Sequence, residues 1–496
     1  MLFNSIAFAI FLPVVFFFYW FLANKSLKAQ NILLLFASWF FYGWWNWKFL
    51  FLLVSLSALN YYIGIQIDKN NDLKKRGTVW LITGLIINLG ILAVFKYYNF
   101  FIDSFIDLIS LIGYNLPKST TKIILPLGIS FYVFLFLSYL LDIKKRTIKA
   151  ERNIIHVLLS FNFFPLILAG PIQRPISLLP QIAKRREFDY ELASGGIRQI
   201  LWGLFTKVVI ADNFAFYVND IFLHYSGYPG STLLLGAGFY AIQIYADFSG
   251  YSNIAIGTAK LFGFRLMKNF AYPYFSRNIA EFWKRWHISL TTWFRDYVFL
   301  PISFAVSWKI KSNRVLLIKP DLFIYIVASV ITWFLTGLWH GANYTFLVWG
   351  MIHGLFLIFY QWQKNPRKRF LRRLGISKEN KSIIALETVF TLAIVLIAWI
   401  FFRADNLEQG LNYLARLFSI SLFSVPIFID RKMCLIIMVI AAIFFIAEWI
   451  GRNEEYTIAR IGERFPAIAR WAVYYTLVII IFFFAGSGQK FIYFQF

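Results

Sequence analysis

Long apolar runs recur along this chain and decide which folds are open to it. One of them, DLFIYIVASVITWFLTGLW at 321–339, is almost free of charge. A helix needs about 20 such residues to cross the hydrocarbon core of a bilayer. Hydrophobic residues make up 59% of the chain, against roughly 45–50% in an ordinary soluble domain. Because a chain in lipid must satisfy its backbone hydrogen bonds internally, we expect an all-α, polytopic integral membrane protein.

The hydropathy pattern predicts about 10–13 helices that cross the membrane or re-enter it, several of them short. The first apolar run lacks the basic start and the small-residue cleavage site of a secretory signal, so we expect a retained span. Residues 98–114 are amphipathic and are expected to lie in the membrane interface. The predicted spans are about 5–23, 31–46, 49–67, 78–95, 122–142, 153–170, 197–217, 232–248, 321–340, 343–363, 382–402, 433–450 and 471–486.

The net charge of +25 is concentrated in short loops between the apolar runs. The basic clusters lie at about 24–30, 68–76, 144–152, 184–186 and 364–373. This is the positive-inside pattern; with the loops at 24–30, 68–76 and 144–152 in the cytoplasm, it predicts that the N-terminus lies outside. Such loops attract anionic lipid headgroups and could also hold a phosphorylated donor. The clustering argues against nucleic acid as a partner.

Cysteine and metal chemistry have little support in the sequence. Cys434 is the single cysteine, and it lies in the apolar run MCLIIMVIAAIFF. It cannot form an internal disulfide, and thiolate catalysis and cysteine-ligated metals are excluded with it. His340 and His353 are thirteen residues apart and would fall on roughly opposite faces of a continuous helix. We therefore expect no metal site and no bound cofactor.

His340 is the most informative titratable residue, because it ends the apolar run at 321–339. An ionisable group at membrane depth is costly and is a functional-site hypothesis by default. The structural alternative is a histidine at a helix end that bonds a backbone carbonyl. For His353, His156 and His224 the structural interpretation is preferred, and His353 is expected on a helix face of small residues that packs closely against a neighbour.

Residues 245–300 interrupt the membrane pattern with charges, glycines and tryptophans. Trp283 and His287 are spaced i, i+4, so on a helix they would share a face. A basic, tryptophan-lined funnel that leads to a histidine would suit an anionic acyl donor; a cytoplasmic loop with interfacial tryptophans is the alternative. The chemistry left open is acid–base catalysis, in which a neutral imidazole takes the proton of an alcohol that attacks a thioester. Partial burial would keep such a histidine neutral.

Seven motifs, in order along the chain, resemble those of one known family. They are Pro126–Tyr132 with Ser138, Tyr139 and Asp142; Phe164-Pro165 with Ala169–Ile172 and Arg174; Asp247–Ser252; Phe282-Trp283 with Arg285–Leu290 and Trp293–Tyr297; Leu338–Gly341; Trp399–Ala404; and Phe491–Phe496. The chain resembles the membrane-bound O-acyltransferase (MBOAT) family, and within it the alginate O-acetyltransferase branch.

The resemblance implies one MBOAT-like membrane domain over residues 1–496, with a central funnel, a polar catalytic core at about 245–360 and C-terminal helices at about 382–496. It implies that His340 is the catalytic base and His287 a second active-site histidine. It further implies acetyl-CoA as the donor, a polysaccharide acceptor, an extracytoplasmic acyl-accepting partner protein and a bacterial inner membrane. The candidate substrate-binding residues are Trp283, Trp286, Arg285, Arg295, Asp296, Asp247, Ser249 and Asn343. Asp247 and Asp296 would orient a histidine or pair with a cation.

The chain departs from the family pattern at three places, and two other functions stay open. Asn253 replaces a frequent Asp, Leu135 replaces a frequent Gln, and residues 301–304 replace a glycine-rich loop, which puts acceptor or partner specificity in doubt. One alternative is transfer of D-alanine to teichoic acid from a carrier protein. The other is a transporter of polysaccharide or ions with no chemistry of its own, which would use intramembrane charges such as Asp247, Glu387 and Glu448.

Overall fold

A computed structural model describes residues 1–486 except 115–122, 311, 313, 316, 317 and 378, and in addition residues 489, 491 and 492. Of the terminal motif at 491–496, residues 493–496 therefore lie outside the described part of the chain. The described chain divides into two compact units, residues 1–203 with 251–267 and residues 204–250 with 268–496. The single domain over 1–496 stays a prediction.

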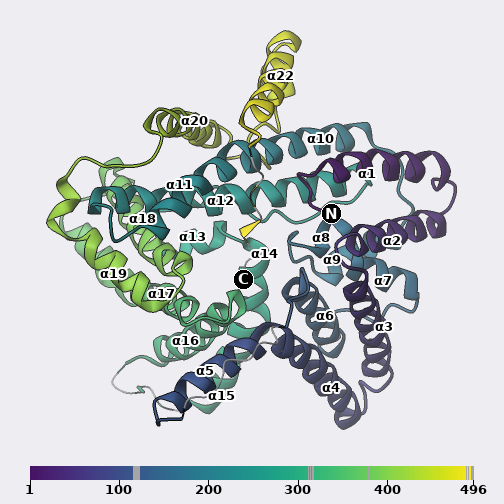
Figure 1. The fold of residues 1–496 in the computed structure, drawn as a ribbon. Coiled ribbons are helices and arrows are strands. Elements are labelled where there is room, and N and C mark those ends of the chain that lie inside the picture. The colour runs from purple at the N-terminus through teal and green to yellow at the C-terminus, as the bar shows by residue number, and fades with distance from the viewer. Residues whose placement is uncertain are drawn as a thin grey trace. The chain divides into compact units, whose positions relative to one another are not determined.

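The first unit is built from helices (Figure 1). They are α1 (Ile6–Phe17), η1 (Phe18–Leu22), α2 (Leu27–Gly43), α3 (Trp47–Lys69), α4 (Lys74–Leu92), η2 (Ala93–Tyr97), α5 (Tyr98–Ser110), α6 (Ile129–Lys144), α7 (Ile154–Asn162), α8 (Phe164–Ile167), α9 (Pro175–Ile182) and α10 (Tyr190–Leu204), followed by the end of α12 (Gly230–Leu261).

Helix α6 forms the core of this unit, because it is buried on nearly all sides and is apolar all round. Glycines let its neighbours come close. A Cβ at Gly64 of α3 would lie 2.6 Å from Tyr139 Cε1, and one at Gly84 of α4 would lie 2.5 Å from Leu140 Cδ1. Larger residues at these two positions would push α3 and α4 away from α6.

The second unit begins at the end of α10 and contains the first part of α12. Its other helices are η3 (Phe205–Ala211), α11 (Asp212–Leu223), η4 (Pro273–Phe275), α13 (Ile279–Arg285), α14 (Ile288–Phe294), η5 (Arg295–Phe299), α15 (Leu300–Lys309), α16 (Pro320–His340), α17 (Tyr344–Arg373), α18 (Lys381–Arg403), α19 (Leu407–Leu417), η6 (Ile420–Phe423), α20 (Arg431–Ile450), α21 (Ile461–Arg464) and α22 (Ala467–Phe484).

Helices α16 and α17 pack directly against each other, and glycines in both make this possible. A Cβ at Gly337 would lie 2.5 Å from the Phe346 carbonyl oxygen, and one at Gly350 would lie 2.4 Å from the Trp333 carbonyl oxygen. The expected small-residue face next to His353 is therefore confirmed. This close approach fixes the position of both histidines carried by the pair.

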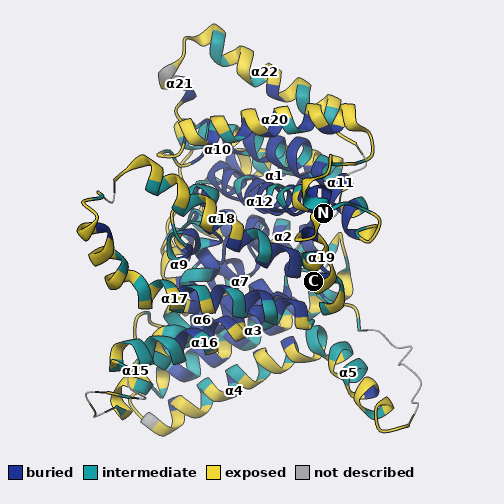
Figure 2. Ribbon diagram, turned by 90° about the vertical axis from the view of Figure 1, so that its left-hand side faces the viewer, coloured by how far each residue is buried: buried dark blue, intermediate teal, exposed yellow. Residues whose placement is uncertain are grey.

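Eight helices of the described chain are long and apolar enough to cross a membrane, so the protein is a multi-pass, all-α membrane protein. The expected number was about 10–13; α1, α2, α6 and α7 are shorter than a full span. Helices α20 and α22 carry exposed residues along much of their length (Figure 2), as lipid-facing helices do. The eight are Trp47–Lys69, Lys75–Ser110, Tyr190–Leu223, Pro320–His340, Tyr344–Arg373, Lys381–Arg403, Arg431–Ile450 and Ala467–Phe484.

The segment expected to lie in the interface at 98–114 forms α5, which continues from α4 through the π-helical turn η2. Its apolar side chains Phe101, Phe105 and Leu108 are exposed, and Ile106 is buried. The helix continues α4 and is not a separate element, and its place in the membrane interface stays a prediction.

Candidate active site

His340 is the last residue of α16, and the chain leaves the helix immediately after it. Gly341 is extended, and a Cβ there would lie 2.2 Å from the Phe346 ring. Asn343 then caps α17, because its Oδ1 accepts a hydrogen bond from the Thr345 backbone N–H at 3.1 Å. The helix is thus broken between His340 and His353, as the separate predicted spans at 321–340 and 343–363 require, so the relation of the two residues on a continuous helix does not apply.

Both histidines instead contact the same indole, that of Trp349. The His340 and Trp349 ring centroids are 4.6 Å apart, and those of Trp349 and His353 are 5.0 Å apart. The Trp283 indole N–H donates a hydrogen bond to His353 Nδ1 at 3.3 Å. His353 is therefore a buried acceptor that fixes Trp283, which agrees with the structural interpretation of this residue.

His287 lies between two short helices and has a left-handed backbone with φ of 40°. Helix α13 ends at Arg285 and α14 starts at Ile288, so the expected helical face shared by Trp283 and His287 does not exist. The His287 side chain is fully buried, and its ring lies 4.6 Å from that of Phe248 between centroids. A left-handed residue without glycine's freedom stores strain, which is a feature of functional sites.

Asn269 fixes the tautomer of His287. The Ser289 backbone N–H donates to Asn269 Oδ1 at 3.3 Å, which identifies this atom as the amide oxygen. His287 Nδ1 lies 3.1 Å from the same atom and must therefore carry a proton and donate it. In the neutral ring, Nε2 then keeps its lone pair and serves as an acceptor or base.

Burial lowers the pKa of His287 to about 3 from its ordinary value of 6.5. The unfolded chain binds this proton below pH 6.5 and the folded chain does not, so acid favours unfolding. Relative to His287→Gln, we expect the wild type to lose about 1.4 kcal/mol of stability per pH unit from about pH 6.5 to about pH 4.5. Unfolding in detergent at several pH values measures this slope. Equal slopes in the two proteins would contradict it.

Trp339 brings the two candidate catalytic histidines to one place. Its ring centroid lies 6.1 Å from that of His287 and 4.9 Å from that of His340. Both imidazoles are buried, at 0% and 3% exposed. The two histidines that the resemblance singled out thus lie close to the same indole, although 53 positions of sequence separate them.

The other predicted site residues occupy several different environments. Trp283 and Trp286 are buried in the aromatic cluster, at 4% and 1% exposed, instead of lining an open surface. Arg285 pairs with Glu281 at 2.7 Å. Ser249 is buried, and Asn343 Nδ2 donates to the Asp405 carbonyl oxygen at 2.7 Å. The funnel stays a prediction.

Both aspartates of the predicted site pair with cations. Asp296 contacts Arg295 at 2.7 Å. Asp247 Oδ1 lies 2.6 Å from the Nζ atom of Lys207, a buried lysine that also contacts Asp212 Oδ1 at 2.7 Å. Lys207 was missed, although a charge inside the apolar run at 197–217 is a recognisable signal of a buried partner.

The same ion cluster holds the last described residues of the chain. The Ile492 backbone N–H donates to Asp247 Oδ2 at 2.8 Å, and Lys207 Nζ donates to the Gln489 carbonyl oxygen at 3.2 Å. Phe491 is buried and packs on Phe248 at 5.8 Å between centroids. Phe248 in turn contacts His287, so the C-terminal segment and the histidine share a neighbour.

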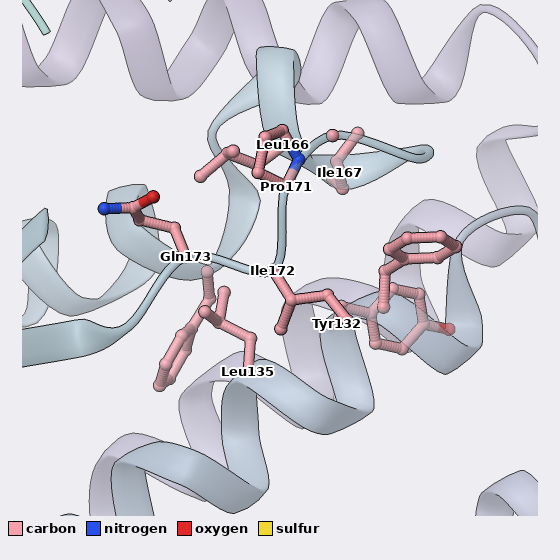
Figure 3. Close-up of a pocket in the computed structure, with 10 residues that line it drawn as sticks. Tyr132, Leu135, Leu166, Ile167, Pro171, Ile172 and Gln173 are labelled. Atoms are coloured by element: carbon pink, nitrogen blue, oxygen red, sulfur yellow. The ribbon is translucent and has the colours of Figure 1, made fainter. Parts of the chain in front are cut away.

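A small cavity in the first unit collects two of the motifs that carry the family resemblance (Figure 3). Tyr132 and Leu135 of α6 line it from one side, and Pro171 and Ile172 line it from the other. Its volume of about 10 Å³ holds no more than a single water molecule. Leu135, where the family often has Gln, gives this cavity an apolar wall.

Comparison with known proteins shows relatives over most of the chain. The probable alginate O-acetylase AlgI of Pseudomonas aeruginosa is 36% identical over 420 residues, which cover 84% of this chain and 75% of that protein. The peptidoglycan O-acetyltransferase of Helicobacter pylori is 33% identical over 444 residues, 84% of this chain and 79% of that protein. The teichoic acid D-alanyltransferase of Bacillus subtilis is 29% identical over 248 residues, 49% of this chain and 61% of that protein.

No family model matches the chain. The relatives above 30% identity nevertheless span more than two thirds of both sequences, and their names describe O-acyl transfer. Together with the multi-pass helical fold, this shows that the chain is an O-acyltransferase and belongs to the membrane-bound O-acyltransferase family.

Proposed function

We propose that this enzyme moves acetyl groups from cytoplasmic acetyl-CoA toward hydroxyls of an exported polysaccharide, directly or through an extracytoplasmic partner protein, in a bacterial inner membrane. The observation that carries the proposal is the pair of buried histidines, His287 and His340, whose rings both lie close to that of Trp339. The names of the relatives, an alginate O-acetylase and a peptidoglycan O-acetyltransferase, suggest acetyl as the acyl group and a polysaccharide as the acceptor.

In the proposed reaction, the His340 imidazole accepts the proton of the acceptor hydroxyl. The hydroxyl oxygen then forms a bond to the acetyl carbonyl carbon, and the carbon–sulfur bond of the thioester breaks. The proton passes from the imidazolium to the leaving thiolate, so CoA departs as a thiol and the base is regenerated. The buried aromatic walls exclude the water that would otherwise hydrolyse the thioester.

His287 is suited to position the donor. Its Nδ1–H is used on Asn269, so the neutral ring offers an acceptor at Nε2. Such a ring can accept a hydrogen bond from an amide N–H or a hydroxyl of a substrate, but it cannot donate one to an oxyanion. Stabilisation of the thioester oxyanion by His287 is therefore less well supported than positioning of the donor.

Trp349 is the better candidate for oxyanion stabilisation. Its Nε1–H is fully buried, has no hydrogen-bond acceptor among the described residues, and belongs to the ring that contacts His340. Loss of one oxyanion donor costs about 10²–10³ in rate. We expect Trp349→Phe, which keeps the ring and removes the N–H, to lower kcat about a hundredfold with KM little changed. Steady-state kinetics with acetyl-CoA tests this, and an unchanged kcat would exclude the role.

Purified protein in detergent with radiolabelled acetyl-CoA tests the proposed function. We expect CoA release and label transfer to an added polysaccharide acceptor, both lost in His340→Gln. The same assay with a D-alanyl carrier protein covers the alternative suggested by the teichoic acid relative. Transfer of D-alanine without any consumption of acetyl-CoA would replace the proposal by that alternative, and consumption of neither donor would favour transport.

A further inference from the structure

A cleft away from the histidines lies where α17 and α18 pack together beside the start of α13. It has a volume of about 420 Å³, within the range of small-molecule sites. Aromatic and aliphatic side chains form most of its wall, among them Phe359, Phe390 and Ile394. Three charged side chains, Arg277, Arg367 and Glu387, also line it.

The two arginines of the cleft differ in how they are neutralised. Arg367 forms an ion pair with Glu387 across the two helices. Arg277 is exposed, and its guanidinium forms no ion pair with any described residue. The nearby carboxylate of Glu281 is already occupied, by Arg285 and by the backbone N–H of Arg277. The cleft therefore carries one uncompensated positive charge at its rim.

The position of the cleft along α17 identifies the depth at which it lies. This helix has 30 residues and is about 45 Å long, which exceeds the roughly 30 Å hydrocarbon core. Its last ten residues contain six lysines and arginines, so this end lies at the charged membrane surface. The cleft extends from Phe356 to Leu371 and so spans the boundary between the apolar and the cationic parts of the helix.

We infer that this cleft binds an anionic glycerophospholipid, with the headgroup phosphate at Arg277 and an acyl chain along Phe359, Phe390 and Ile394. A phosphate complements the free guanidinium, and it accepts hydrogen bonds from the planar fork of an arginine. The lining includes Phe356 and Ile394 from the apolar parts of α17 and α18, where an acyl chain attached to that phosphate would lie. A zwitterionic lipid offers the same chain without the net charge.

Titration of the purified full chain in detergent with phosphatidylglycerol, followed by native mass spectrometry, tests the site without any acyl transfer. We expect specific binding of phosphatidylglycerol over phosphatidylcholine of the same chains, and about fivefold weaker binding in Arg277→Gln. Arg369→Gln is the matched control. It removes the same charge from an exposed residue of α17 that does not line the cleft, and binding should stay within about twofold of wild type.

Two further experiments distinguish a specific lipid site from nonspecific electrostatic attraction of anionic lipids. Glu387→Gln removes the negative charge of the cleft and releases Arg367, so it should tighten phosphatidylglycerol binding, provided that thermal unfolding confirms the fold. Inorganic phosphate should not compete at millimolar concentration. Equal losses in Arg277→Gln and Arg369→Gln, no preference for the anionic lipid, or full competition by phosphate would each overturn the inference.

Discussion

Replacing His340 with glutamine should reduce acyl transfer by about 10²–10⁴, the usual contribution of a positioned general base. Glutamine keeps a polar side chain of similar length at the end of α16, but its amide cannot accept a proton at neutral pH. His340 is 3% exposed and its ring packs against Trp349 and Phe402. Because the proposed role of the imidazole is proton transfer and not substrate binding, the loss should appear in kcat. CoA release from acetyl-CoA, measured with and without acceptor, gives the value.

The matched control is His224→Gln. His224 is 60% exposed at its side chain and contacts Asp220 at 3.0 Å, at the end of α11. Its replacement should leave both the rate and the thermal unfolding temperature unchanged. An active His340→Gln protein would show that His340 is not the general base. An inactive His224→Gln protein would show that the assay reports damage to the fold.

The sequence predicts the class of fold and the position of His340 at the end of a helix well, because both follow from local patterns. Apolar runs of the required length correspond to the eight membrane-capable helices, and the run at 321–339 ends at His340 as a helix in the structure. The small residues around His353 indicate close packing, which the structure confirms at Gly350. These features depend on composition and spacing within one segment.

What the sequence does not predict depends on contacts between distant segments or on one backbone angle. The break at His287 rests on a left-handed residue that is not glycine, and no local pattern indicates it. Asn269 lies 18 positions before His287, and its role is visible only once the chain has folded back. Lys207 and Asp247 are 40 positions apart, and each alone reads as an unexplained charge in an apolar region.

Lys207→Met should cost about 3–5 kcal/mol of stability, the largest structural effect expected from a single exchange in this chain. The ammonium is 3% exposed and lies within 2.7 Å of carboxylates of both Asp212 and Asp247. Methionine fills the same space but leaves two buried carboxylates without their common partner. Thermal or denaturant unfolding in detergent measures the loss, with exposed Lys309→Met as the control.

Removing a negative charge from the same cluster, in Asp247→Asn, should destabilise the protein much less than Lys207→Met. The difference between the two variants tests the ion cluster more sharply than either variant alone. In Asp247→Asn, Lys207 still pairs with Asp212, and the amide oxygen can still accept the Ile492 backbone N–H. The cluster changes from one cation with two anions to a neutral pair, so we expect a cost of about 1 kcal/mol.

Lys207→Met/Asp247→Asn should then be more stable than Lys207→Met, because one unpaired carboxylate remains instead of two. If Asp247→Asn destabilises the protein as much as Lys207→Met, the contact of Asp247 with the Ile492 backbone contributes more to stability than its ion pair with Lys207. The cluster would then hold residues 489–492 next to Phe248 and His287 as its main role.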